Sequence, residues 1–198
     1  MNPTEYRSLL IQTLESLDMS AIDQLAALFL DAHERGAQIF TMGNGGSGAS
    51  ASHAAGDFLK GASYGLDKRF KMICLNDNLP SMMAIANDIG WDDIFVEPLK
   101  NYLQPGDLVI GISGSGNSRN VLKAGEYAQA NGATLVGMTG FKGGLLREMS
   151  DLSIHSVAMD MEVAEDVHMA VFNMVKKVCM ARLLGEKPSM GETYDARF

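Results

Sequence analysis

The chain has 198 residues, 46% of them hydrophobic, and its 16 Lys and Arg against 24 Asp and Glu give a formal charge of −8. A surplus of negative charge repels nucleic-acid phosphates, so we expect no DNA or RNA partner. The length and the apolar content predict one domain with a sizeable core. No apolar run reaches the roughly 18 to 20 residues that span a bilayer, and the first residues lack signal-peptide features, so we expect a cytoplasmic protein without membrane contact.

Two cysteines, Cys74 and Cys179, lie far apart in the sequence, each inside an apolar run. This spacing indicates neither a disulfide framework nor a clustered thiolate zinc site. We expect both cysteines to be small core residues.

Two helices are expected before the first strand. Apolar residues recur at helical spacing over residues 6–17, and Pro3 suits an early helix position. A second helix is expected from Ser20, where Asp23 three residues on resembles a capping box, to Gly36, which stops it. Residues 1–36 are therefore predicted to form N-terminal helices.

From residue 37 to residue 184, short apolar segments alternate with amphipathic helical ones. The strand candidates are residues 38–42, 71–75, 108–112, 134–138 and 152–157. Strands that are apolar on both faces and separated by helices favour a parallel sheet with right-handed crossovers. We predict a single-domain, doubly wound α/β fold with a five-stranded sheet.

A polar tail, residues 185–198, closes the chain. Two states of this tail stay open, one loose and one docked on a neighbouring subunit.

Unusual loops follow two of the predicted strands. Residues 43–50 read Gly-Asn-Gly-Gly-Ser-Gly-Ala-Ser, and residues 113–118 read Ser-Gly-Ser-Gly-Asn-Ser. In a parallel sheet, ligands collect beyond the carboxyl ends of the strands. Glycines let the backbone approach an anion, and N–H groups at a helix start and serine hydroxyls donate hydrogen bonds. The pair of loops predicts a phosphate-monoester site, whereas a single such loop could be a tight turn without a ligand.

A nucleotide cofactor is not expected. Gly43, Gly45 and Gly48 match the dinucleotide-binding spacing, with Asp77 as a candidate ribose ligand. Asp77, however, comes some ten residues later than the usual interval of about 20, and that fold has no need of a second phosphate cradle. A kinase-type phosphate loop fails because no Gly-Lys-Ser/Thr follows the glycines.

Several motifs occur in a fixed order: residues 43–47, His53 on the following helix, residues 86–88, residues 112–118, and the glycines of residues 139–144. Together they resemble the sugar isomerase (SIS) family in its phosphoheptose isomerase branch, from the N-terminal helices to about Leu184. The resemblance implies a flavodoxin-like parallel sheet, a homotetramer, and a phosphorylated sugar bound between subunits. It implies an aldose–ketose isomerase that acts on sedoheptulose 7-phosphate or a similar phosphosugar.

The same resemblance implies the substrate-binding residues. It places the phosphate on the loop of Ser113, Gly114, Ser115 and Ser118. The positions expected near the sugar are Asn44, Gly45, Gly46, Ser47, Asn87, Asp88 and Asn173.

Catalytic positions in the family are a histidine followed after four residues by glutamate, and a glutamine followed after eight residues by histidine. The matching residues here are His53, Asp57, Glu165 and Asn173, so only the first is unchanged. Moving a carbonyl between C1 and C2 needs a base and an acid. Asp57 is the candidate base, and because Asn173 has no titratable proton, Glu165 or His168 is the candidate acid.

His53, Asp57 and Glu165 also form a candidate ligand set for one divalent metal, zinc, since an imidazole and two carboxylates are a recognised set. Such a metal would replace the missing histidine as electrophile. The alternative is that Glu165 pairs with a lysine or arginine, and that His53 and Asp57 are a simple surface pair.

Two functions therefore stay open. One is the isomerase. The other is a noncatalytic SIS module that binds a phosphosugar or a protein partner, as in the replication-initiator-associating relative of this family.

Overall fold

A five-stranded parallel sheet forms the centre of the computed structural model, which describes residues 1–185. Its strands are β1 (Gln38–Gly43), β2 (Lys71–Cys74), β3 (Leu108–Ser113), β4 (Thr134–Thr139) and β5 (Leu152–His155). The strand order β2-β1-β3-β4-β5 is that of flavodoxin-like doubly wound sheets. The predicted fold class is confirmed, and each predicted strand is found. The predicted tail lies, from residue 186 on, outside the described residues.

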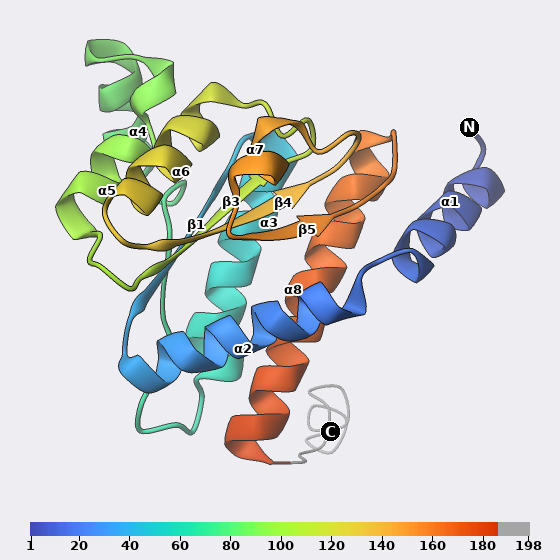
Figure 1. The fold of residues 1–198 in the computed structure, drawn as a ribbon, viewed down its shortest axis with the longest axis horizontal. Helices are drawn as coiled ribbons and strands as arrows, with labels where there is room; N and C mark the ends of the chain where they lie inside the picture. The colour runs from blue at the N-terminus through green and yellow to red at the C-terminus, as the bar shows by residue number, and fades with distance from the viewer. Residues whose placement is uncertain (186–198) are drawn as a thin grey trace, which may run out of the picture.

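Helices cover both faces of this sheet (Figure 1). They are α1 (Pro3–Glu15), α2 (Met19–Arg35), α3 (Gly45–Gly56), α4 (Leu79–Asp88), α5 (Val96–Tyr102), α6 (Arg119–Ala130), α7 (Gly144–Met149) and α8 (Met161–Leu184). A π-helical segment, η1 (Asp57–Ala62), continues α3, and a 3₁₀ turn, η2 (Trp91–Asp93), precedes α5.

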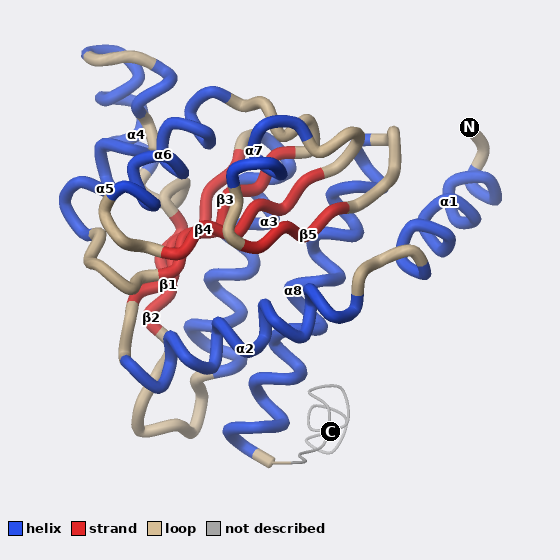
Figure 2. Tube along the Cα trace, viewed as in Figure 1, coloured by secondary structure: helices blue, strands red, loops and turns tan. Residues whose placement is uncertain are grey.

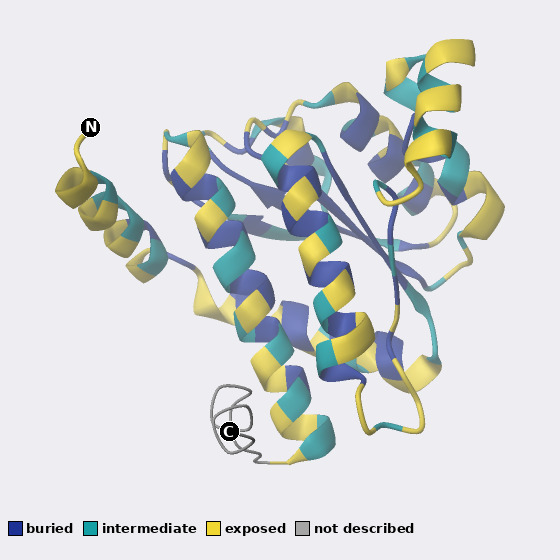
Figure 3. Ribbon diagram, turned by 180° about the vertical axis from the view of Figure 1, so that it is seen from behind, coloured by how far each residue is buried: buried dark blue, intermediate teal, exposed yellow. Residues whose placement is uncertain are grey.

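Successive strand residues lie in two separate hydrophobic cores, because side chains alternate between the two faces of a strand. In β1, Ile39 belongs to a core with α2, α3 and α8, whereas Phe40 belongs to a core with α5, α6 and α7. Figure 2 shows the strands between these helix layers, and Figure 3 shows the buried sheet behind the half-exposed α3 and α8. Burial on both faces explains why β3 is apolar along almost its whole length.

The N-cap of helix α2 lies two residues earlier than the sequence pattern suggests. Its N-cap is Asp18, whose carboxylate accepts hydrogen bonds from the backbone N–H groups of Ser20 and Ala21. The expected Ser20 cap is therefore wrong: Asp18 is the N-cap, and Ser20 lies inside the helix, where its own N–H is one of the donors that Asp18 accepts. The predicted stop is confirmed: Gly36 takes the left-handed conformation with φ 72°.

Helix α1 extends away from the sheet and lies against α8 (Figure 1). The Tyr6 hydroxyl donates to Asp166 Oδ2 on α8 at 2.7 Å. This hydrogen bond to a carboxylate, helped by burial, raises the pKa of Tyr6 to about 12. Several apolar side chains of α1, among them Leu9 and Leu10, pack only partly buried against the core.

Cys74 and Cys179 are both buried and free, which confirms their expected place in the core. Burial raises the pKa of the Cys74 thiol to about 11 and that of the Cys179 thiol to about 12, so both are protonated near neutral pH. Within residues 1–185, no helix has the length and apolar character that crossing a bilayer demands.

Candidate active site

The first glycine loop leads from β1 directly into α3. Its N-cap residue, Asn44, exchanges two side-chain hydrogen bonds of 2.9 Å with Asn120 near the start of α6. Asn120 is 1% exposed, and its Oδ1 also accepts from the backbone N–H of Val121. This amide pair ties the helix after the first loop to the helix after the serine loop. Sequence reasoning missed Asn120, which follows the serine motif by two residues.

A second amide, Asn76, holds the end of β1. Its Nδ2 donates to the Gly43 carbonyl at 2.8 Å, and its Oδ1 accepts from the Gly43 N–H at 3.3 Å. Asn76 follows β2, so it links the ends of the two neighbouring strands. Its place directly after a strand was the only sequence signal that pointed to it.

The serine loop brings three hydroxyls together between β3 and α6. Ser113 Oγ lies 3.0 Å from Ser118 Oγ and 3.5 Å from Ser115 Oγ. Ser118 is the N-cap of α6 but makes no capping hydrogen bond with its side chain. Hydroxyls that converge at an uncapped helix start are suited to bind a phosphate, because the helix dipole and free N–H groups favour an anion there. The structure brings together the three serines that the sequence selected.

Residues 140–146 hold the serine loop in place through backbone hydrogen bonds. The Gly140 N–H donates to the Gly114 carbonyl at 2.9 Å, and the Leu146 N–H donates to the Gly116 carbonyl at 2.9 Å. Gly116 has φ 66°, and a Cβ atom there would overlap the Gly143 carbonyl. Only glycine fits this position, so the two glycine-rich loops interlock.

Glu165, on α8, reaches the start of α3. Its carboxylate lies against Gly46, and a Cβ atom on Gly46 would overlap it. Burial, followed by the nearby carboxylates of Glu162 and Asp166, raises the pKa of Glu165. Glu165 therefore shares the end of the sheet where Asn44 and the first glycine loop lie.

Asp57 lies at the opposite end of α3. Its Oδ2 forms an ion pair with Lys176 Nζ of α8 at 2.8 Å and lies 3.7 Å from His53 Nε2. The side chains of Lys176 and Asp57 are 19% and 27% exposed, whereas His53 is 62% exposed. Sequence reasoning missed Lys176, because a lysine on a long helix looks like a solvated residue.

Helices α3 and α8 run side by side (Figure 3). Glu165 of α8 contacts Gly46, and Lys176 of α8 contacts Asp57. Gly46 and Asp57 are 11 positions apart, which at 1.5 Å per residue places them about 16 Å apart along the helix. Asp57 and Glu165 of one chain therefore cannot bind the same metal ion. Consistent with this, no group of three His, Cys, Asp or Glu side chains in the described residues is placed to hold a metal.

His168, the other candidate acid, lies inside the core. It is 1% exposed, and its Nε2 lies 3.1 Å from the Thr139 carbonyl, to which it donates. Burial lowers the pKa of His168 to about 4, so the ring is neutral at pH 7. Asn173, between Glu165 and Lys176 on α8, is exposed.

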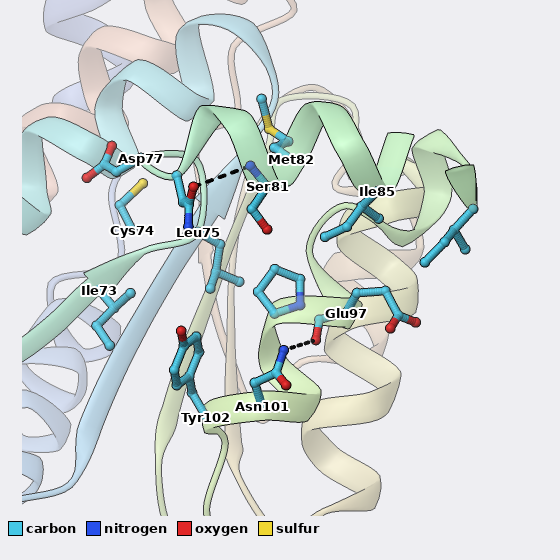
Figure 4. A pocket seen from close by; sticks show the side chains of 13 residues that line it. Ile73, Cys74, Leu75, Asp77, Ser81, Met82, Ile85, Glu97, Asn101 and Tyr102 are labelled. Carbon is cyan, nitrogen blue, oxygen red and sulfur yellow. Dashed lines mark hydrogen bonds between the residues drawn. The ribbon is translucent and has the colours of Figure 1, made fainter. Parts of the chain in front are cut away.

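Asn87 and Asp88 lie exposed at the end of α4, where Asn87 Nδ2 donates to Asp88 Oδ1 at 2.7 Å. In the described part of the chain, no hydrogen bond links either residue to the two loops. A cavity of about 790 Å³ lies beside β2 between α4 and α5 (Figure 4). It is lined by Asp77, Glu97 and Tyr102 among others, and by none of the residues expected to bind the sugar phosphate, a metal or the reacting proton.

Comparison with known proteins gives the family. The model of the SIS domain matches residues 4–140. Phosphoheptose isomerase from Chlorobium limicola is 31% identical over 188 residues, which cover 93% of this chain and 86% of that protein. Its counterpart from Geotalea daltonii is 31% identical over 180 residues, 89% of this chain and 93% of that protein.

A solved structure of phosphoheptose isomerase from Neisseria gonorrhoeae superimposes with a TM-score of 0.81 at 25% identity, covering 89% of this chain and 93% of that one. The structure of the enzyme from Francisella tularensis has the same TM-score at 23% identity, which supports the fold. From the matched motifs, the interlocked loops and these relatives, we conclude that the chain belongs to the SIS domain family.

Proposed function

We propose that this protein is an aldose–ketose isomerase of the phosphoheptose isomerase type that converts sedoheptulose 7-phosphate to a heptose 7-phosphate. The observation that carries the proposal is the cluster of Ser113, Ser115 and Ser118 at the uncapped start of α6. The relatives that match almost the whole chain are phosphoheptose isomerases, and they support the enzyme over the noncatalytic module. Phosphorylated sugars are charged and do not cross membranes unaided, so a cytoplasmic location is part of the proposal.

In this proposal the three serines and the first N–H groups of α6 hold the phosphate. The sugar extends from there toward the start of α3, where Asn44, Gly45, Gly46 and Ser47 offer backbone and side-chain groups. Asn87, Asp88 and Asn173 are proposed contacts for the sugar hydroxyls. All three are exposed, so a bound sugar can reach them without unfolding the chain.

Isomerisation moves one proton between neighbouring carbons. The Asp57 carboxylate takes a proton from C1 of the ketose while an acid donates one to the C2 oxygen, which leaves an enediol. The same proton then returns to C2, and the C1 hydroxyl loses its proton as the aldehyde forms. We give the acid role to Glu165, since its raised pKa favours the protonated form and His168 is buried against a backbone carbonyl.

These two roles require a second copy of the chain. An acid and a base that serve C1 and C2 must each lie within hydrogen-bond reach of those atoms. Asp57 and Glu165 of one chain are about 16 Å apart along α3. We therefore propose a homotetramer in which Asp57 of one subunit faces the loops and Glu165 of another.

Light scattering tests the assembly. The expected mass is about four times the 21.3 kDa of one chain. Deleting residues 1–18 removes α1 and should reduce that mass, because the exposed side of α1 is then lost. A wild-type mass near 21.3 kDa would contradict the proposal.

The zinc site expected from the sequence does not fit the residues of one chain. Asp57 already has Lys176 as its cationic partner, and Glu165 lies at the other end of α3. No step of the proposed reaction passes through a metal. Elemental analysis of protein purified without chelator and offered zinc is the direct check, repeated on His53→Ala: less than about 0.1 zinc per subunit in both samples would exclude the site, whereas zinc that is lost in His53→Ala would show that the three residues meet between subunits.

An activity assay decides between the two functions. Purified protein is incubated with sedoheptulose 7-phosphate, and the aldose product is measured by chromatography. Turnover supports the isomerase. Binding of the sugar phosphate by calorimetry without any turnover would instead support the noncatalytic module.

A further inference from the structure

The ion pair between Lys176 and Asp57 differs from the other ion pairs in the described residues. Its cation is 19% exposed, whereas the cationic side chains of the other pairs are at least 46% exposed. Asp57 is also the only carboxylate within ion-pair distance of Lys176 in residues 1–185. An exposed pair gains little from its charges, but partial removal of water strengthens the attraction. The contact between α3 and α8 is therefore more than a solvated surface pair.

The local backbone makes room for this lysine. Gly61 lies in η1, one turn beyond Asp57, and a Cβ atom there would come within 2.9 Å of both Cε and Nζ of Lys176. The gap left by the missing side chain admits the lysine stem on its way to Asp57. The segment is π-helical, a geometry that often occurs at functional sites. Ammonium, carboxylate and glycine thus form one arrangement across two helices.

We propose that Lys176 is a positioning residue of the isomerase, one that orients the Asp57 carboxylate for proton abstraction. This inference rests on the proposed function. Nζ donates to Oδ2 at 2.8 Å, which fixes the rotation of the carboxylate and leaves Oδ1 open to the substrate. Aspartate is one methylene shorter than the glutamate that the family resemblance places here, so its position must be set more tightly.

The same ammonium supplies the positive charge that a metal ion would otherwise bring to this carboxylate. It keeps Asp57 from needing any other cationic partner. The enzyme should accordingly work in the presence of a chelator. Lys176 acts through Asp57 and makes no contact of its own with the sugar.

Substitution of Lys176 is the first test. In Lys176→Met, kcat should fall about 100-fold, the loss that follows a misplacement of about 1 Å, while KM stays within about threefold because the serine loop still holds the phosphate. Lys176→Arg retains the charge and should regain at least tenfold of the lost kcat. Lys177→Met makes the same change at an exposed neighbour and should leave kcat unchanged.

Gly61→Ala is the second test, and it leaves every charged group in place. The added methyl displaces the flexible end of Lys176, so kcat should again fall while KM holds. Gly56→Ala is the matched control, since a Cβ atom there meets nothing within 4 Å. Thermal unfolding of each variant shows that the fold is retained.

The outcomes separate the two proposals. A wild-type protein that turns over no aldose or ketose phosphate overturns the proposed function, and Lys176 loses its role with it. An active wild type whose Lys176→Met and Gly61→Ala variants keep kcat within about twofold overturns the positioning role alone. Equal losses of kcat in Lys176→Arg and Lys176→Met, or activity abolished by a chelator, also contradict it.

Discussion

The two ends of the α3 and α8 pair carry different kinds of chemical group. At the start of α3, backbone groups, hydroxyls and amides dominate, with Asn44 bonded to Asn120 and Ser113 close to Ser118. At the end of α3, charged side chains dominate, with Lys176 on Asp57 and His53 beside them. The first end suits an anion that must be held firmly, and it also carries the proposed acid, Glu165. The second end carries the proposed base, so phosphate binding and proton abstraction from carbon are assigned to separate ends.

Removing the base should have the largest effect and would test this division most directly. Asp57→Asn keeps the size of the side chain but cannot accept the carbon-bound proton, so kcat should fall by about 10² to 10⁴. KM should change little, because the phosphate contacts lie at the other end. The measurement is steady-state turnover of sedoheptulose 7-phosphate. Asp23→Asn, an exposed aspartate on α2, is the control. A kcat loss below about tenfold would contradict the assignment of Asp57 as the base.

Changes to the serine loop should have the opposite effect, in that they weaken substrate binding rather than lower kcat. Replacing Ser113 and Ser115 together by Ala should weaken sugar-phosphate binding by roughly 2 to 3 kcal/mol, at about 1 to 1.5 kcal/mol per lost hydrogen bond. Calorimetric titration of the double variant measures this directly. Unchanged affinity would mean that the phosphate binds elsewhere.

The amide bridge between the loops should matter for stability before it matters for function. Asn120→Ala removes both hydrogen bonds to Asn44 at a buried position, which should lower the free energy of unfolding by about 2 kcal/mol. Denaturant unfolding gives the value. Asn101→Ala, at an exposed site on α5, should cost less than about 0.5 kcal/mol. Equal losses in the two variants would show that the bridge does not hold the loops together.

The smallest expected effect concerns Glu165. Its pKa is raised in the folded chain, so the folded state binds more protons than the unfolded state between the two pKa values. Stability is thus greatest below the ordinary glutamate pKa and falls as pH rises through the raised one. Glu165→Gln removes this loss of stability and should therefore raise Tm at pH 7. The difference in Tm from wild type should disappear toward about pH 4. A variant that lowers Tm at pH 7 would mean that the carboxylate stabilises the loop.

Sequence reasoning found the binding end of the site because its signals are local. A strand that ends in glycine and serine, followed by a helix, can be read from neighbouring residues, and Ser113 to Ser118 are contiguous. Strands β1, β3 and β4 were equally readable, since burial on both faces makes them largely apolar. The helix cap at Asp18 was missed because Ser20 has the same capping chemistry two residues later.

The other end was less readable because its partners come from distant segments. Asp57 and Lys176 are joined only when α3 lies beside α8, and no local pattern records that contact. The zinc set is not assembled within one chain for the same reason. His53, Asp57 and Glu165 have suitable chemistry, but the parallel course of the two helices separates Glu165 from the others. The sequence identified side chains of the right chemical type for a metal site. The spacing of residues in the sequence could not show where along α3 and α8 these side chains would lie relative to one another.

The packing of α1 and α2 against α8 has a consequence for synthesis on the ribosome. The first two helices leave the exit tunnel long before their partner is made, since Tyr6 and Asp166 are 160 residues apart. Their apolar faces therefore stay uncovered during most of translation, when aggregation is a hazard. The sheet can form earlier from neighbouring strands, but the layer that α8 completes must wait for the last helix. A ribosome stalled before residue 161 should carry a nascent chain that chaperones bind through α1 and α2.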